Sequence, residues 1–325
     1  MNDEHVLITG ATGFIGSHVV TKILRDKSFT IIAIVRKIDD YKNVKELEHR
    51  GVILIEGSFY DEKLIIYLFE KYPIQHVIHI AAIRGEGSGT SSDYLLVNVQ
   101  GTGFLLEASL KKRVKKFIYC SSVGVFGSIP HEVPANIKTR LNGDNNYHNS
   151  KILAEKKVQE FITRGLNAFI VRPAITYGKN DTGFSSTLIK MVKRKMLLVS
   201  FRDNKIHLLD VNKLAEIFYV ILTTDYSQNR LFIAADTAPI LLRELVDLIH
   251  NYYYKKNYPK ILKMPHIFFN ILFQLFRSIN NNKWCVRIQL LYKDWFFNTN
   301  ELKSLTEIQL SNTREMFLGY LENQN

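Results

Sequence analysis

The chain has 325 residues and carries 43 Lys and Arg against 31 Asp and Glu, a formal net charge of +12 at pH 7. Its 46% of apolar and 23% of charged residues exclude a disordered chain, which needs low hydrophobicity. The two cysteines, Cys120 and Cys285, exclude a disulfide-rich scaffold and a four-cysteine zinc site, and we predict no metal centre.

The N-terminus and the charge bear on location and partners. Asp3 and Glu4 stand where a secretory signal would carry cations, so we expect no signal peptide. No run of about 18 uncharged apolar residues occurs, so we expect no membrane-spanning helix and place the protein in a reducing cytoplasm. The net positive charge is compatible with binding to nucleic acid, to an anionic membrane surface or to an anionic substrate. It is also compatible with a solvated surface that has no specific partner. We favour the last, because an abundance of Lys, Asn, Ile and Tyr can arise from nucleotide composition.

Strand and helix patterns alternate along the first half of the chain. The expected strands are His5–Thr9, Thr30–Val35, Val52–Ile55, His76–Ile80, Phe117–Ser121 and Phe169–Arg172. The expected helices are Gly16–Arg25, Leu64–Lys71, Ser92–Lys112 and Tyr147–Arg164. This alternation predicts an α/β fold, a doubly wound parallel sheet with helices on both faces.

The pattern loosens after about residue 175. We expect helices at Ser186–Lys195, Val211–Thr223 and Leu242–Tyr254, and short strands near Lys205–Leu209 and Arg230–Ala234. The apolar stretch Pro265–Phe276 is too short to span a bilayer, and we interpret it as a helix that packs on the core.

A glycine-rich segment separates the first expected strand from the first helix. Gly10 permits a tight turn, Gly13 lets a pyrophosphate approach the backbone, and Gly16 lets helix and strand pack closely. The phosphates then lie on free N–H groups at a helix N-terminus. We therefore predict a dinucleotide-binding Rossmann-type domain over residues 1–175, interleaved with a smaller substrate-binding part over residues 176–325.

The end of the second strand bears on the choice of cofactor. NAD-binding domains usually place a carboxylate there, to bind the ribose hydroxyls. This strand ends in Arg36 and Lys37, and a guanidinium can bind a 2′-phosphate with two hydrogen bonds. We therefore favour NADP(H), while Asp39 and Asp40 keep NAD(H) open.

Tyr147 and Lys151 are four residues apart at the start of an expected helix and therefore share a face. A nearby ammonium favours the phenolate, so we expect Lys151 to lower the pKa of Tyr147. Tyr147 could then exchange a proton while a nicotinamide exchanges a hydride. Ser121 and Ser122 follow an expected strand at the carboxyl edge of the sheet, where a hydroxyl can orient the reacting oxygen.

These motifs and five others follow one another along the chain. The set is Thr9–Gly16, Gly57–Asp61, His79–Ala82, Val97–Thr102, Ser121–Gly127, Tyr147–Lys151, Arg172–Gly178 and His207–Val211. In this order the chain resembles the extended short-chain dehydrogenase/reductases, the family named after NAD-dependent epimerases and dehydratases.

The resemblance implies a role for each matching residue and a homodimer that packs through the Asn98 and Tyr147 helices. Ser122 takes the catalytic Ser/Thr place, with Ser121 the less favoured alternative, Tyr147 the acid/base place and Lys151 that of its partner. Asn98 matches an asparagine that ties its helix to neighbouring backbone. The residues expected to bind the cofactor are Gly10, Thr12, Gly13, Phe14, Ile15, Gly16, Arg36, Ser58, Ala81, Ala82, Asn98, Tyr147, Lys151 and Pro173.

Departures from the family pattern limit the reactions that we expect this protein to catalyse. Ser58 stands where the family often has an Asp that contacts adenine. Nucleotide-sugar 4,6-dehydratases follow their catalytic Thr with Asp-Glu, whereas Val123 and Gly124 follow Ser122 and carry no proton, which argues against a dehydratase. We assign no catalytic role to Cys120. A 4-ketoreductase, which we favour, or a 4-epimerase acting on a nucleotide sugar needs only Ser, Tyr, Lys and the cofactor.

The substrate is less sharply indicated. Five cations lie where relatives of this length bind a nucleotide diphosphate, although a solvated helix face is an equal interpretation; they are Lys190, Lys193, Arg194, Lys195 and Arg202. The glycines of Arg84–Thr90 suit a mobile substrate loop.

Three alternatives stay open. The first is an NADPH-dependent reductase of steroid- or flavonoid-like ketones, with which the apolar stretch Pro265–Phe276 is compatible. A non-catalytic NADP-sensing regulator is a different class, disfavoured because such a protein needs no proton donor at Tyr147. A nucleic-acid binder is disfavoured because we find no recognition helix or zinc signature.

Overall fold

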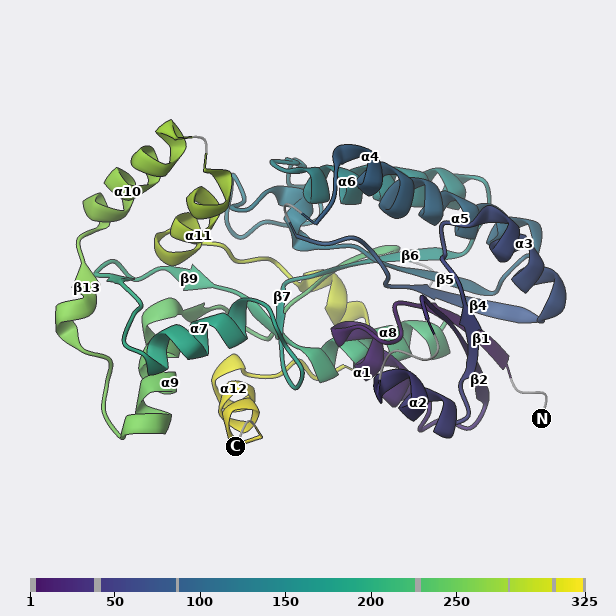
Figure 1. Ribbon diagram of the computed structural model, residues 1–325, viewed down its shortest axis with the longest axis horizontal. Coiled ribbons are helices and arrows are strands. Elements are labelled where there is room, and N and C mark those ends of the chain that lie inside the picture. The colour runs from purple at the N-terminus through teal and green to yellow at the C-terminus, as the bar shows by residue number, and fades with distance from the viewer. Residues whose placement is uncertain are drawn as a thin grey trace.

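A seven-stranded parallel sheet forms the centre of the protein (Figure 1). The computed structural model describes residues 4–37, 42–85, 88–225, 229–279, 281–305 and 308–323. The strand order is β11-β6-β5-β4-β1-β2-β3. The strands are β1 (Glu4–Thr9), β2 (Phe29–Val35), β3 (Ile53–Glu56), β4 (Ile74–His79), β5 (Lys116–Cys120), β6 (Ala168–Pro173) and β11 (Leu231–Ala234). The predicted doubly wound, Rossmann-type α/β fold is confirmed.

Helices cover both faces of this sheet (Figure 1). One face carries α1 (Phe14–Ile23) and α8 (Val211–Thr223), and the other carries α3 (Glu62–Lys71), α5 (Gly101–Lys111) and α6 (Asn146–Thr163). Helix α2 (Lys42–His49) connects β2 and β3. Successive strand side chains point to opposite faces, so Val6 and Ile8 of β1 enter one core while Leu7 enters the other.

Two expected elements are interrupted. The helix expected over Ser92–Lys112 contains a π-helical turn, Leu95–Gln100, between α4 (Ser91–Tyr94) and α5. The strand expected near Lys205–Leu209 is two strands on either side of buried His207, whose Nε2–H donates to the Asp236 carbonyl at 2.9 Å. Of these, β9 (Lys205–Ile206) pairs with β12 (Ile240–Leu241), and β10 (Leu208–Asp210) pairs with β7 (Ile175–Tyr177).

The second half of the chain contributes α8 and β11 to the central layers and builds further elements beside them (Figure 1). These are α7 (Phe184–Lys193), β8 (Val199–Ser200), α9 (Leu242–Tyr254), η3 (Lys260–Leu262), β13 (Lys263–Met264), α10 (His266–Ser278), α11 (Asn282–Tyr292), η4 (Asn300–Ser304) and α12 (Thr313–Glu322). In the first half, the short turn η2 (Val123–Phe126) follows β5. Among the described residues, no helix is both long enough and apolar enough to cross a membrane. The expected division near residue 175 stays a prediction.

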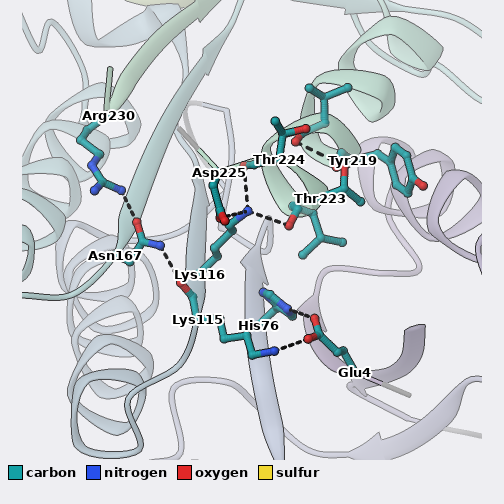
Figure 2. A network of polar contacts seen from close by, with 12 residues as sticks. Glu4, His76, Lys115, Lys116, Asn167, Tyr219, Thr223, Thr224, Asp225 and Arg230 are labelled. Atoms are coloured by element: carbon teal, nitrogen blue, oxygen red, sulfur yellow. Dashed lines mark hydrogen bonds and ion pairs between the residues drawn. The ribbon is translucent and has the colours of Figure 1, made fainter. Parts of the chain in front are cut away.

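A polar network lies at the amino-terminal edge of the sheet (Figure 2). The Lys116 ammonium, buried at the start of β5, donates to the carbonyls of Leu222 at 3.0 Å and Thr224 at 2.8 Å, at the C-terminus of α8. A cation is favourable there because the last carbonyls of a helix have no helical partner. Glu4 binds His76 beside it, with 2.6 Å between the carboxylate and Nε2. These charges stabilise the edge opposite the predicted site.

Candidate active site

The glycine loop fits a dinucleotide pyrophosphate. Gly10 has a φ of 77°, and its carbonyl accepts the Gly13 N–H at 3.0 Å. A Cβ at Gly16 would lie 2.0 Å from the Gly10 oxygen, so the loop and α1 meet too closely for any other residue. Gly13 precedes α1, and no side chain in the described part of the chain caps this helix end. The first-turn amides of α1 are therefore suited to an anion.

The loop is fixed against the end of β4 by a buried relay. The Thr102 hydroxyl donates to the Asn98 carbonyl at 2.7 Å, so it accepts from Nε2–H of His79 at 2.9 Å. Nδ1 of His79 then accepts from the Thr9 hydroxyl at 2.7 Å. The Thr9 oxygen in turn accepts the backbone N–H of Ala81 at 3.2 Å. Burial lowers the pKa of His79 well below its usual range, and the neutral ring fits this relay.

Asn98 lies in the π-helical turn and is 1% exposed. Its amide donates to the Ile83 carbonyl at 2.8 Å and to the Ser150 hydroxyl at 2.9 Å, and its oxygen accepts the Ile83 N–H at 2.8 Å. Ser150 donates in turn to the Tyr147 carbonyl at 2.7 Å. Asn98 thus ties the loop after β4 to the helix of Tyr147, as its place in the family pattern implied. Its cofactor contact stays a prediction.

The two serines after β5 have different surroundings. Ser121 is buried, and its hydroxyl donates to the carboxylate of Glu155. Ser122 is half-buried, caps the turn η2 by accepting the Gly124 N–H at 3.0 Å, and lowers the pKa of the nearby Tyr147 phenol. Ser122 is therefore the serine that meets the predicted acid/base residue.

Sequence reasoning missed the ion pair beneath these serines. Arg172 of β6 donates from Nε and Nη2 to the two oxygens of Glu155 on α6, at 2.9 and 2.6 Å. Both side chains are 2% exposed or less. Arg172 lay in a recognised motif, but nothing in the spacing of the chain indicated Glu155, which lies four residues after Lys151 on the same helix face.

The structure contradicts the expected effect of Lys151 on Tyr147. Burial, with a contribution from Cys120, raises the pKa of Tyr147 to about 12, although Ser122 and the guanidinium of Arg84 oppose the rise. Burial lowers the pKa of Lys151 to about 8. The Lys151 ammonium donates to the Cys120 carbonyl at 2.8 Å. At neutral pH these residues are therefore a phenol and, mostly, an ammonium.

Val123 and Gly124, which follow Ser122, carry no acidic side chain, as expected from the sequence. Gly124 leaves room for the ring of a neighbouring histidine. A Cβ at Gly124 would lie 2.4 Å from the ring of His148. His148 hydrogen-bonds Asp144. Although burial opposes it, this contact and the hydrogen bond from the Ser128 N–H lower the pKa of Asp144 to about 2. A histidine–aspartate pair, which the sequence reasoning did not identify, thus lies beside the serine turn.

The other predicted cofactor residues lie along the carboxyl edge of the sheet. Arg36 is exposed directly after β2, and the Gly57 N–H donates to the Val35 carbonyl at 2.8 Å, which brings half-buried Ser58 beside that strand end. Pro173 ends β6. The remaining positions, in the glycine loop or after β4, are Thr12, Phe14, Ile15, Ala81 and Ala82. Asp39 and Asp40 lie outside the described residues, as do Glu86 and Gly87 of the expected substrate loop.

Two further motifs meet around a buried carboxylate rather than at this edge. Asp236 is fully buried and accepts hydrogen bonds from the Tyr177 hydroxyl at 3.0 Å, the Thr313 hydroxyl at 2.7 Å and the Asp210 N–H at 3.0 Å. Asp210 caps α8 through the N–H groups of Asn212 and Lys213. Burial raises the pKa of Asp236 to about 6. The motifs at 172–178 and 207–211 therefore connect α12, α8 and the sheet.

The fold and this edge define an enzyme of the Rossmann-type class that uses a nicotinamide dinucleotide. The chain belongs to the NAD dependent epimerase/dehydratase family, whose sequence model matches residues 6–234. The family assignment made from the ordered motifs is confirmed.

Characterised relatives cover part of the chain. The human UDP-glucose 4-epimerase is 31% identical over 199 residues, 55% of this chain and 56% of the relative. The dTDP-D-glucose 4,6-dehydratase of Dictyostelium discoideum is 33% identical over 177 residues, 49% of this chain and 40% of the relative. The chain spans about half the length of the curated relatives it matches.

Solved structures match the fold over nearly the whole chain. The UDP-glucose 4-epimerase of Thermotoga maritima, solved with UDP-glucose, has a TM-score of 0.73 at 19% identity and covers 98% of this chain and 99% of its own. The enzyme WbmG of Bordetella bronchiseptica, solved with NAD, has a TM-score of 0.76 at 19% identity and covers 98% and 93%.

Proposed function

We propose that the protein transfers a hydride between a nicotinamide cofactor and a carbinol or ketone carbon of a nucleotide sugar, and that it is a 4-ketoreductase. The observation that carries the proposal is the placement of Ser122 beside the buried Tyr147 phenol, whose pKa it lowers, with Lys151 one helical turn further along α6. This is the arrangement needed to hold a carbonyl oxygen and to protonate it.

In the proposed reaction the bound nicotinamide supplies the hydride. Tyr147 is a phenol at neutral pH and donates its proton to the carbonyl oxygen. Ser122 orients that oxygen through its hydroxyl. The Lys151 ammonium donates to the Cys120 carbonyl at the end of β5, and we also propose that it binds the cofactor. Asn98 acts as a positioning residue, because its side chain holds Ile83 and Ser150.

Arg36 supports the proposal that the cofactor is NADP(H). It is exposed at the end of β2 and can bind a 2′-phosphate there. Titration of the purified protein with NADPH and with NADH tests this role of Arg36. The wild type should bind NADPH more tightly than NADH, and Arg36→Ala should bind both with similar affinity. An unaltered preference in Arg36→Ala, or a preference for NADH in the wild type, would refute the role of Arg36.

The second candidate is a 4-epimerase, which oxidises its substrate and reduces it again on the other face. Several matching relatives are UDP-glucose 4-epimerases, which favours this activity. One observation favours the reductase: the exposed cation at the end of β2, which fits NADP(H) rather than the NAD that an epimerase retains.

Mass spectrometry of the purified protein, followed by a panel of UDP- and dTDP-sugars, separates the two. A reductase consumes NADPH in proportion to a 4-keto sugar. An epimerase retains NAD and interconverts C4 epimers without net cofactor consumption. Turnover of steroid- or flavonoid-like ketones alone, or of no compound despite tight NADP binding, would replace the proposal with one of the other two classes.

We further propose a homodimer that packs through α6 and the helix of Asn98. Three large apolar side chains on these helices are exposed: Leu95 by 41%, Leu96 by 41% and Leu153 by 38%. Sedimentation of the double variant Leu96→Glu, Leu153→Glu tests this proposal. Two carboxylates in the apolar interface should dissociate a dimer into monomers.

A further inference from the structure

The net charge of the chain is concentrated in two segments. Residues 182–202 and 251–293 together hold 13 of the 43 Lys and Arg and none of the 31 Asp and Glu. The remainder of the chain carries 30 basic against 31 acidic residues. The formal charge of +12 is therefore a property of these two segments, not of the whole surface.

The two segments lie against each other at the end of the molecule that is far from the N-terminus (Figure 1). Strand β8 of the first pairs with β13 of the second. The Lys193 ammonium lies 4.2 Å from the ring centre of Tyr253, and that of Lys195 lies 5.3 Å from the ring centre of Tyr254. The cations thus belong to one basic region, and α10 begins inside it.

Helix α10 has two apolar faces, and only one of them is covered. On the inner face, Phe269 is 1% exposed and stacks on Tyr292 of α11 with 5.8 Å between ring centres. On the outer face, Ile267, Ile271 and Leu275 are 67%, 61% and 56% exposed. Their spacing of four residues makes one stripe along the helix. The segment forms the expected packing helix, but it packs in a separate small cluster with α11 and leaves this stripe exposed.

Further apolar side chains are exposed beside basic ones near the start of α10. Ile261 is 83% exposed and lies between Lys260 and Lys263 in the sequence. Phe201 is 57% exposed, and its N–H donates to the Met264 carbonyl at 2.9 Å. Exposed apolar groups gathered in one place mark an interaction surface.

We propose that the outer face of α10 binds the protein to an anionic lipid surface. The aliphatic stripe enters the boundary between headgroups and acyl chains, and the surrounding cations contact lipid phosphates and carboxylates. The helix lies along the surface, as its 13 residues are too few to cross a bilayer.

Charge and the apolar stripe together favour an anionic lipid surface over a second copy of the chain and over a nucleic acid. A second copy of the chain on a two-fold axis would bring two copies of these net-positive segments together, and like charges across an interface repel. A nucleic acid would use the cations but would leave the stripe of Ile and Leu side chains in water, because base recognition relies on stacking and hydrogen bonds. An anionic bilayer complements both the charge and the apolar stripe.

Flotation of the purified full chain with vesicles tests the proposal. We expect binding to vesicles of equimolar phosphatidylcholine and phosphatidylserine, weaker binding as salt is added, and little binding to phosphatidylcholine alone. Failure to float with the mixed vesicles at low salt, or equal flotation with both, would overturn it.

Two variants separate the apolar and the charged contributions. Ile271→Ser, Leu275→Ser removes the middle of the stripe and should weaken binding at least about tenfold. Lys260→Gln, Arg277→Gln removes two exposed cations and should weaken it about 30-fold, at about 1 kcal/mol for each basic side chain. The matched control is Ile66→Ser, Tyr67→Ser on α3, where the side chains are 48% and 49% exposed, and it should bind as the wild type does.

The outer stripe is not part of the cluster around Phe269, so both variants should keep the wild-type melting temperature. Wild-type binding by both variants would refute the proposal. A variant that sediments as a smaller species, or a surface that binds oligonucleotides in preference to vesicles, would assign the surface to a second copy or to nucleic acid instead.

Trp284 gives an independent readout. It is 44% exposed and stacks on Phe276 of α10 with 5.6 Å between ring centres, whereas Trp295 is 2% exposed. Its emission should shift to shorter wavelength when the mixed vesicles are added, and Trp284→Phe should abolish the shift. An unchanged spectrum with bound vesicles would place the contact elsewhere.

Discussion

Ser121 donates a buried hydrogen bond to Glu155, while the hydroxyl of the next residue, Ser122, lowers the pKa of the Tyr147 phenol. Two adjacent hydroxyls are thus separated into a structural one and one directed at the proposed reacting centre. Because they are chemically identical, their substitution by alanine isolates position as the variable.

Ser122→Ala should lower kcat about 10- to 100-fold and leave the melting temperature within a few degrees, because it removes a group that orients the reacting oxygen. Ser121→Ala should lower the melting temperature, since it removes a partner from a buried carboxylate. Steady-state kinetics and thermal unfolding of both variants check this. A larger kcat loss in Ser121→Ala would exchange the two roles.

Glu155 and Arg172 form a buried ion pair, so removal of one charge should be costly. Glu155→Gln should reduce the free energy of unfolding by about 3 to 5 kcal/mol, because Arg172 stays buried without its counter-charge. The matched control is Glu107→Gln on the surface, whose pair with Arg164 at 3.1 Å should contribute less than about 1 kcal/mol. Chemical denaturation measures both, and equal losses would contradict the distinction.

Gly16 and Gly319 both lie in helices but differ in their surroundings. A Cβ at Gly16 would lie 2.0 Å from the Gly10 carbonyl oxygen, whereas nothing lies within 4 Å of a Cβ at Gly319. Gly16→Ala should therefore disrupt the loop and abolish cofactor binding. Gly319→Ala should stabilise the protein by up to about 1 kcal/mol. Calorimetric titration and thermal unfolding test the pair; cofactor binding retained by Gly16→Ala would remove the loop from the proposed site.

Asp236 predicts a dependence of stability on pH. Its pKa is raised from 3.8 to about 6 in the folded protein, so the folded state holds a proton that the unfolded state has lost. Its contribution to stability is therefore present below about pH 4 and is lost as pH rises to about 6. Compared with Asp236→Asn, the wild type should lose roughly 2 to 3 kcal/mol over that interval. Denaturant unfolding at several pH values measures the difference, and parallel profiles would contradict the raised pKa.

Local patterns were sufficient for much of the fold. The bounds expected for Val211–Thr223 and Leu242–Tyr254 match α8 and α9, because hydrophobic periodicity is read over a short window. The ordered motifs also placed Ser122, Tyr147 and the glycine loop on one edge of the sheet. Such features depend on neighbouring residues or on strand ends that the topology brings together.

What the sequence did not indicate depends on long-range contacts. The pairing of Glu155 with Arg172 and the convergence of hydroxyls on Asp236 join residues that only the fold brings together. The π-helical turn at Asn98 departs from the regular helical period. The high pKa of Tyr147 reflects burial, which spacing alone does not report. The exposure of the α10 stripe likewise depends on where α11 packs.

The most direct test of the account is the turnover of Tyr147→Phe, measured beside the wild type with the 4-keto nucleotide sugar or epimer pair identified in the panel. The substitution removes one hydroxyl and keeps the ring, so the melting temperature should stay close to that of the wild type. We predict that kcat falls at least about 100-fold, because the proton donor is lost. Turnover equal to that of the wild type would contradict the assignment of Tyr147 as the acid/base and, with it, the proposed mechanism.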